Sequence, residues 1–212
     1  MKILHVAGLH LRQEWFEWVS GRVASAHLDL VAVSGDLLDV TSTVPLPKQQ
    51  EIVRAWIENL RRTPVVICSG NHDGGLDLAS LRESGAIVAV DGETWNHDGL
   101  RIGVSGWDTA PVMNCDILVT HAPPCGCACA ASGDRDHGDL EHADALRGGE
   151  GPELILAGHI HQPQRRHCRF PPIDPFCTVL VPGFCDAPVP NHWVIDTEKK
   201  RAMSESGDVV KI

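Results

Sequence analysis

Five short apolar runs in this chain each end in a polar cluster. Such runs are typical of buried strands, as in Val65-Val66-Ile67-Cys68. The clusters that follow them are Gly8-Leu9-His10, Gly35-Asp36, Gly70-Asn71-His72-Asp73, Thr120-His121 and Gly158-His159-Ile160-His161. Sites in α/β sheets form outside the carboxyl ends of the strands. The pattern therefore predicts an α/β fold in which these loops build one site.

Helical periodicity and turn residues fill the segments between the runs. Helices are predicted over 12–26, 49–62, 76–83 and 140–146, and loops over 41–47 and 125–138. Strands are predicted over 3–7, 28–33, 65–68, 86–90, 116–120 and 153–157, with a hairpin within 93–106 that turns at Asp98-Gly99. Three further strands, near 165–169, 178–181 and 192–196, are expected to complete a second sheet. With no repeat or linker, we expect a single domain over 1–212.

The composition restricts the classes of partner. The chain has 212 residues, 43% of them hydrophobic, and a formal net charge of −10. This charge argues against a general nucleic-acid or anionic-membrane surface. It still allows an anionic substrate held by metal ions. Because no signal peptide and no apolar run near 20 residues is evident, we expect a cytoplasmic protein without membrane partners.

The polar clusters together supply a mixed nitrogen and oxygen ligand set. Its members are His10, Asp36, Asn71, His121, His159 and His161. Each histidine taken alone is more often a surface or core residue than a ligand. As a set they suit borderline divalent metals such as Mn²⁺, Fe²⁺ or Zn²⁺. His72 and Asp73 belong to the cluster after the third predicted strand. A histidine can donate a proton to a leaving group, and an adjacent aspartate can fix the tautomer of that histidine.

In their order and spacing, these clusters resemble the motifs of the calcineurin-like metallophosphoesterase family. The family pattern is D-x-H, G-D-x-x-D, G-N-H-D/E, an isolated His and G-H-x-H, and it is matched here from residue 3 to about 185. Thr120-His121-Ala122-Pro123-Pro124 also resembles the small stand-alone phosphoesterase branch. The resemblance implies two mixed β-sheets packed face to face with flanking helices, a four-layer αββα sandwich.

The resemblance also implies a site for two divalent metal ions. Site 1 would take His10 and His161, site 2 would take Asn71, His121 and His159, and Asp36 would bridge both. Two such ions, about 3.5–4 Å apart, activate a water that attacks phosphorus. His72 would protonate the leaving oxygen or stabilise the charge that develops on it, and Asp73 would orient His72. The implied activity is hydrolysis of a small phosphomonoester or phosphodiester.

Gly8 departs from the family pattern, which has an aspartate at this position. Three interpretations remain open. Site 1 binds metal weakly or stays empty, with water in the missing place; another carboxylate such as Asp39 fills it; or the chain is a one-metal or inactive relative that binds rather than cleaves. An intact His72 favours residual chemistry over a pure binding module.

Two rival functions can be separated by simple measurements. A degenerate member acting as a protein-interaction scaffold should not need stoichiometric metal. A nuclease of the same fold should show salt-dependent DNA binding, but the acidic charge and the lack of a basic or aromatic platform count against it. The sequence predicts neither the substrate nor the oligomeric state.

The eight cysteines include a C-x-C-x-C cluster formed by Cys125, Cys127 and Cys129. Its spacing differs from the usual C-x₂-C zinc pairs. Reduced thiols in a mobile loop that borders the substrate opening are therefore expected. The alternatives are a thiolate metal site or a disulfide from the cluster to Cys168 or Cys177.

Overall fold

Two large β-sheets form the centre of the computed structural model, which describes residues 1–60, 62–149, 151–171 and 176–212. Within those residues, the first sheet has seven strands in the order β15 (Val209–Lys211), β14 (Arg201–Ser204), β13 (Trp193–Asp196), β1 (Lys2–Val6), β2 (Leu30–Ser34), β3 (Val65–Cys68) and β4 (Ile87–Ala89). The second has six, in the order β11 (His167–Phe170), β12 (Cys177–Leu180), β10 (Leu154–Ala157), β7 (Ile117–Thr120), β6 (Leu100–Ser105) and β5 (Thr94–His97).

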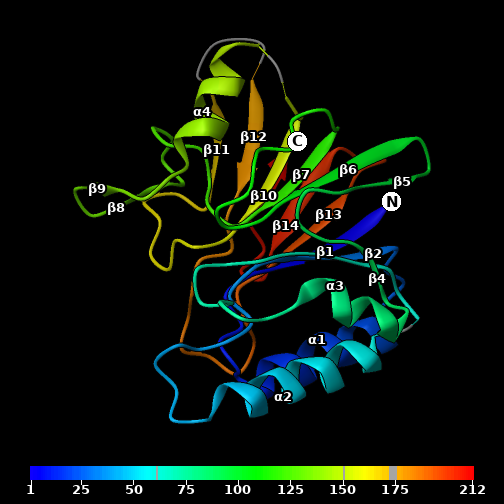
Figure 1. Ribbon diagram of the computed structural model, residues 1–212. Coiled ribbons are helices and arrows are strands. Elements are labelled where there is room, and N and C mark those ends of the chain that lie inside the picture. The colour runs from blue at the N-terminus through cyan, green and yellow to red at the C-terminus, as the bar shows by residue number, and fades with distance from the viewer. Residues whose placement is uncertain (61, 150, 172–175) are drawn as a thin grey trace.

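Helices cover the outer faces of both sheets (Figure 1). On the first sheet lie α1 (Gln13–Ser25), α2 (Leu46–Asn59) and the short α3 (Leu78–Leu81), which continues as a 3₁₀ turn over Arg82–Ser84. Beside the second sheet lies α4 (Leu140–Arg147), next to a small hairpin of β8 (Ala131–Ser132) and β9 (Arg135–Asp136). Within the described ranges, none of the helices has the length and apolar character needed to cross a bilayer.

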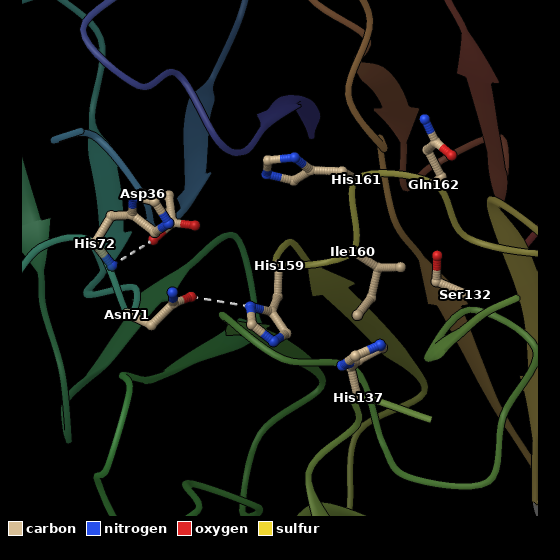
Figure 2. A pocket seen from close by; sticks show the side chains of 9 residues that line it. All are labelled: Asp36, Asn71, His72, Ser132, His137, His159, Ile160, His161 and Gln162. Carbon is tan, nitrogen blue, oxygen red and sulfur yellow. Dashed lines mark hydrogen bonds between the residues drawn. The ribbon is translucent and has the colours of Figure 1, made fainter. Parts of the chain in front are cut away.

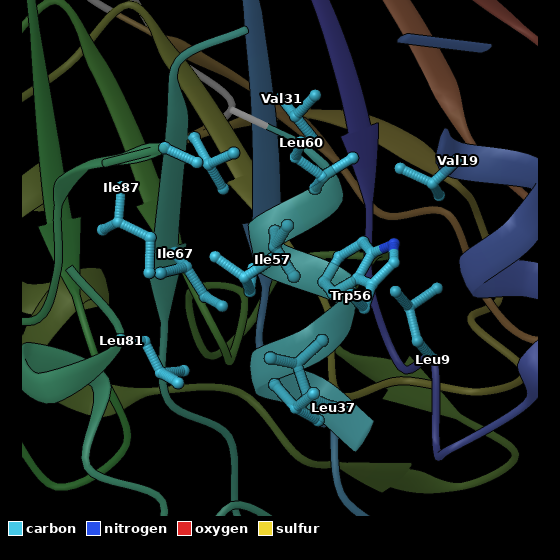
Figure 3. Packing of buried hydrophobic residues seen from close by; sticks show 14 of the residues in the cluster. Leu9, Val19, Val31, Leu37, Trp56, Ile57, Leu60, Ile67, Leu81 and Ile87 are labelled. Atoms are coloured by element: carbon cyan, nitrogen blue, oxygen red, sulfur yellow. The ribbon is translucent and has the colours of Figure 1, made fainter. Parts of the chain in front are cut away.

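Three apolar clusters separate these layers, because alternate residues of a strand point to opposite faces. On β2, Val31 and Val33 pack against α1 and α2, where Trp56, Ile57 and Leu60 face the sheet (Figure 3). Their neighbours on the strand belong to the second cluster, which fills the space between the sheets. A third cluster lies under α4, on the far side of the second sheet. The predicted four-layer sandwich is thus confirmed.

Parallel pairing places the ends of the key strands together. In the first sheet β1, β2 and β3 are parallel neighbours, and in the second β6, β7, β10 and β12 are parallel neighbours. The carboxyl ends of each set therefore meet at one edge of its sheet. This arrangement brings the polar loops of both sheets to one end of the sandwich.

Most predicted elements are present, with three informative differences. The helix predicted over 49–62 begins at Leu46, because Pro47 is tolerated in a first helical turn; Arg61 lies outside the described residues. The strand near 192–196 belongs to the first sheet rather than the second, since β13 pairs antiparallel with β1. Strands β14 and β15 were not predicted, because segments of four and three residues carry little hydrophobic pattern.

His5 on β1 generates a prediction about acid stability. It is fully buried, its Nε2–H donates to Ser34 Oγ at 2.9 Å, and Ser34 Oγ–H donates to the Leu156 carbonyl at 2.9 Å. Burial, with smaller effects from Arg166 and His192, lowers the pKa of His5 to about 3. The unfolded chain therefore binds a proton below about pH 6.5 that the folded chain excludes, so stability falls as the pH falls.

Between about pH 7.5 and about pH 5, His5 should account for a loss of about 2 kcal/mol in the free energy of unfolding. His5→Gln keeps a donor for Ser34 and should remove this part of the loss. Urea unfolding at both pH values measures it. His97→Gln, on the β5–β6 hairpin, is the control and should retain the wild-type pH dependence. If wild type and His5→Gln lose the same free energy of unfolding between the two pH values, the folded protein does not prevent the protonation of His5.

Candidate metal centre

The predicted ligands come together at the loops that follow five strands. His10 follows β1, Asp36 follows β2, Asn71 follows β3 and His121 follows β7. The loop after β10 contributes His159 and His161 (Figure 2). Every one of the six residues predicted as a ligand thus lies at this end of the sandwich.

Close approach of the loops explains two of the glycines. A Cβ atom at Gly35 would lie 2.5 Å from His121 Nδ1, and Gly35 also has a φ of +77°. A Cβ atom at Gly70 would overlap Asp36 Oδ1. A side chain at either position would force apart the loops that carry Asp36, Asn71 and His121.

One group of ligand atoms surrounds Asn71 Oδ1. This oxygen lies 2.9 Å from His121 Nε2 and 2.9 Å from His159 Nδ1. His121 Nδ1 lies 2.9 Å from the Ser34 carbonyl, to which it can only donate, so Nε2 of the neutral ring carries a lone pair. That lone pair faces Asn71 Oδ1 and, at 3.4 Å, Asp36 Oδ2. Acceptor atoms that face one another in this way are suited to hold a cation between them.

A second group has the same character. His10 Nδ1 lies 3.3 Å from the Leu38 carbonyl, which leaves the lone pair on Nε2. This atom lies 3.2 Å from His161 Nε2 and 3.9 Å from Asp36 Oδ2. Asp36 is therefore shared by both groups, and the ligand atoms of each histidine–aspartate set lie within 4.8 Å of one another. The donor set thus fits two cations that share one carboxylate.

Burial keeps these histidines available as ligands. It lowers the pKa of His10, His121 and His161, and it lowers that of His159 to about 4 with help from the nearby His121. The rings are consequently neutral near pH 7, and a neutral imidazole is the form that binds metal.

His72 lies beside these groups without joining either histidine–aspartate set. Its ring packs edge-on against His10, with the centroids 4.7 Å apart, and its backbone N–H donates to Asp36 Oδ1 at 2.9 Å. The Val40 N–H donates to His72 Nδ1 over a long 3.4 Å, so the proton of the neutral ring lies on Nε2. His72 also lines a cavity of about 360 Å³, so its side chain adjoins the space open to a substrate (Figure 2).

Asp73 has a different task from the one predicted. Its carboxylate is buried and accepts four backbone N–H groups, from Asp36, Leu37, Leu38 and Gly70, at 2.8–2.9 Å. The prediction that Asp73 orients His72 directly is therefore wrong, because both carboxylate oxygens are directed at the loop backbone. Asp73 instead fastens the loop after β2 to the loop after β3.

Gly8 and Asp39 bear on the departure from the family pattern. A Cβ atom at Gly8 would lie 3.4 Å from His10 Nε2, so a side chain there would approach the second group. Asp39 is near as well, since its carboxylate lies within 4.8 Å of ring nitrogens of His10 and His72. Partial burial opposes ionisation, yet two hydrogen bonds from Thr41 hold the pKa of Asp39 below its usual value.

Sequence reasoning missed several residues around the site. Ser132, His137 and Gln162 line the cavity (Figure 2), while Trp107 and Phe184 flank the histidines. Phe184 stacks on His161 at 4.8 Å, and Trp107 lies 5.2 Å from His159. Both aromatic residues also follow strand ends, after Gly106 and Gly183. A search for polar clusters passes over them because their side chains are apolar.

The segment 125–138 differs from the irregular loop that was predicted. It contains the β8–β9 hairpin, and its Cys127 and Cys129 are buried in the third apolar cluster. Ser132 and His137 from the same segment reach the cavity. The segment therefore borders the opening with these two residues, while two of its cysteines face the core.

A family model, the calcineurin-like phosphoesterase superfamily domain, matches residues 1–198. The chain belongs to this superfamily. No curated protein matches the chain.

Two solved structures share the fold of this chain. An archaeal phosphodiesterase is 18% identical, with a TM-score of 0.62 over 99% of this chain and 100% of its own. TT1561 of Thermus thermophilus is 14% identical, with a TM-score of 0.66 over 96% of this chain and 97% of its own. As a member of the calcineurin-like phosphoesterase superfamily, the chain has His and Asp groups suited to the two divalent metals that this family generally binds.

The four amide bonds of Asp73 predict that Asp73→Asn destabilises this phosphoesterase domain. An amide NH₂ would face backbone N–H donors that now meet an oxygen, which should lower the free energy of unfolding by about 1–3 kcal/mol. Urea denaturation measures the change. Asp98→Asn, in the β5–β6 turn, is the matched control and should be nearly neutral. If Asp73→Asn instead keeps the stability of wild type but has a shifted pH–rate profile, Asp73 orients His72 directly.

Proposed function

We propose that this chain is a divalent-metal-dependent phosphoesterase that hydrolyses a small phosphomonoester or phosphodiester. The observation that carries the proposal is the convergence of two lone-pair groups on the shared Asp36 carboxylate. Site 1 takes His10 and His161, site 2 takes Asn71, His121 and His159, and Asp36 serves both. Mn²⁺, Fe²⁺ and Zn²⁺ fit this mixture of imidazole and oxygen ligands.

Divalent cations bound here would supply Lewis acidity, which lowers the pKa of water and offsets charge on phosphoryl oxygens. The protein's own residues supply position and a proton. Because the Val40 N–H is directed at Nδ1, Nε2 is the nitrogen from which a protonated His72 ring would donate to a leaving oxygen. The Asp73 carboxylate accepts the Asp36 N–H, and the Asp36 carboxylate accepts the His72 N–H. These two bonds fix the backbone at Asp36 and His72. The open cavity of about 360 Å³ suits a small ester.

Site 2 should be the better-filled metal site. It combines Asp36, Asn71, His121 and His159, and the Ser34 carbonyl fixes the tautomer of His121. Site 1 has Asp36, His10 and His161, with Asp39 as a further carboxylate nearby. Ligand number favours site 2.

Two other functions are less well supported. A metal-free scaffold protein gains nothing from four histidines and a shared Asp36 carboxylate that converge at one place. A nuclease would have to bind a polyanion against a formal net charge of −10. Stoichiometric metal would exclude the scaffold, and steep salt dependence of DNA binding would favour the nuclease.

Hydrolysis of two aryl esters tests the function and the role of His72 together. Wild type should hydrolyse phenyl phosphate and p-nitrophenyl phosphate with Mn²⁺ and lose both activities after EDTA. His72→Ala should lower phenyl phosphate turnover about 10²–10⁴-fold while metal content stays constant. The loss on p-nitrophenyl phosphate should be smaller, because p-nitrophenolate leaves without needing a proton.

The matched control is His97→Ala, which removes a histidine at the end of β5 in the second sheet. This variant should hydrolyse both esters at the wild-type rate. Loss of metal in His72→Ala in proportion to rate would mean that His72 holds metal rather than a proton. Metal-loaded wild type without activity on mono- and diesters, including p-nitrophenyl phenylphosphonate, would contradict the proposed function.

Gly8→Asp tests the departure at site 1. The added carboxylate should tighten metal there and raise activity at low Mn²⁺, and saturating Mn²⁺ should narrow the gap by mass action. Gly8 has a φ of +59°, so the substitution should also cost about 1 kcal/mol of stability. Gly8→Ala carries the same strain without the carboxylate and is the control in a metal titration of rate. Overlapping curves for all three proteins would mean that another residue, such as Asp39, already completes site 1.

A further inference from the structure

Three cysteine sulfurs converge at a place that is chemically distinct from the histidine and aspartate ligands of the candidate metal centre. Cys127 and Cys129 lie two residues apart between Pro124 and β8, and Cys168 lies on β11. Their Sγ atoms lie within 4.8 Å of one another. Zinc bound tetrahedrally by sulfur at about 2.3 Å places neighbouring sulfurs about 3.8 Å apart, so small side-chain movements suffice.

Access and charge are both suitable for an ion. Cys127 and Cys129 are buried, but Cys168 lines a groove of about 590 Å³. Arg165, Arg169 and Lys211 line the same groove. Three thiolates around a divalent ion carry one net negative charge, which these cationic side chains would offset. The groove also gives a water molecule access to the fourth position of a tetrahedral ion.

We propose that Cys127, Cys129 and Cys168 form a structural site for a thiophilic divalent metal ion of the zinc class. Each thiol that binds releases its proton to solvent. A disulfide accounts for the cluster less well, because it would join two of the sulfurs and leave the third buried beside them. Soft sulfur ligands also separate this site from the nitrogen and oxygen ligands of the catalytic loops.

The bound ion would brace one wall of the catalytic cavity. The segment after His161 already bonds to the cysteine segment, through Gln164 N–H to the Ala131 carbonyl at 2.8 Å and Arg165 N–H to the Ala128 carbonyl at 3.2 Å. Ser132 and His137, just beyond, line the cavity. A metal that joins Cys168 to Cys127 and Cys129 would lock these segments together.

Co²⁺ titration of the reduced full-length protein tests the site directly. Thiolate-to-cobalt charge transfer should appear in the near-ultraviolet and reach saturation, and Co²⁺ held by the imidazole and carboxylate ligands of the other sites gives no such band. Zn²⁺ should abolish the band by displacement. Cys168→Ser should lower Co²⁺ affinity at this site more than about 100-fold. Cys115→Ser, outside the cluster, should keep the wild-type band.

Stability provides an independent measurement. Chelation should lower the Tm of wild type and Cys115→Ser, and change that of Cys168→Ser by less. If Cys168→Ser fails to fold, the wild-type cobalt spectrum and its displacement by Zn²⁺ still decide the question. Absence of the band, its persistence in folded Cys168→Ser, or an intact mass showing a disulfide within the cluster that resists mild reduction would overturn the proposal.

Discussion

The end of the molecule that carries the candidate metal centre depends on one buried carboxylate. Asp73 accepts backbone amides from both the loop after β2 and the loop after β3, at 2.8–2.9 Å. Charge-assisted bonds of this kind are among the stronger ones in proteins, and here they act on a backbone that no regular sheet pairing holds. Asp36, at a φ of +57°, is kept in its unusual conformation by the same carboxylate. The position of every ligand on these two loops therefore follows from Asp73.

The second requirement is that the two sheets approach closely at this end. Gly158 N–H donates to the His121 carbonyl at 2.8 Å, and a Cβ atom at Gly158 would lie 2.5 Å from the Ser34 carbonyl of the opposite sheet. Ser34 thereby contacts the loops of the second sheet while its carbonyl also receives the His121 ring. A larger residue at position 158 would separate His121 and His159 from Asp36. Packing between the sheets, rather than either sheet alone, thus completes the metal centre.

The ligand positions could be predicted from the sequence because each is local to a strand end. A run such as Leu154–Ala157 followed by Gly158-His159 fixes both the strand and the place where it stops. Three of the four partners of Asp73 could not be predicted, because they are backbone groups 35–37 residues away. The sheet that receives β13 was predicted wrongly for a related reason, since pairing with β1 joins residues at opposite ends of the chain. Cys168 likewise meets Cys127 only through the fold.

The two halves of the centre are not braced equally, and the difference matches the sequence. His121 is buried and its Nδ1 is held by the Ser34 carbonyl at 2.9 Å, whereas His161 is exposed and rests on the face of Phe184. Stacking restrains the plane of a ring but leaves its rotation within that plane less defined than a hydrogen bond does. Gly8 falls on this less restrained side, next to His10. A missing carboxylate there leaves the half around His121 intact, so the sequence departure falls on the side of Asp36 that carries the exposed His161.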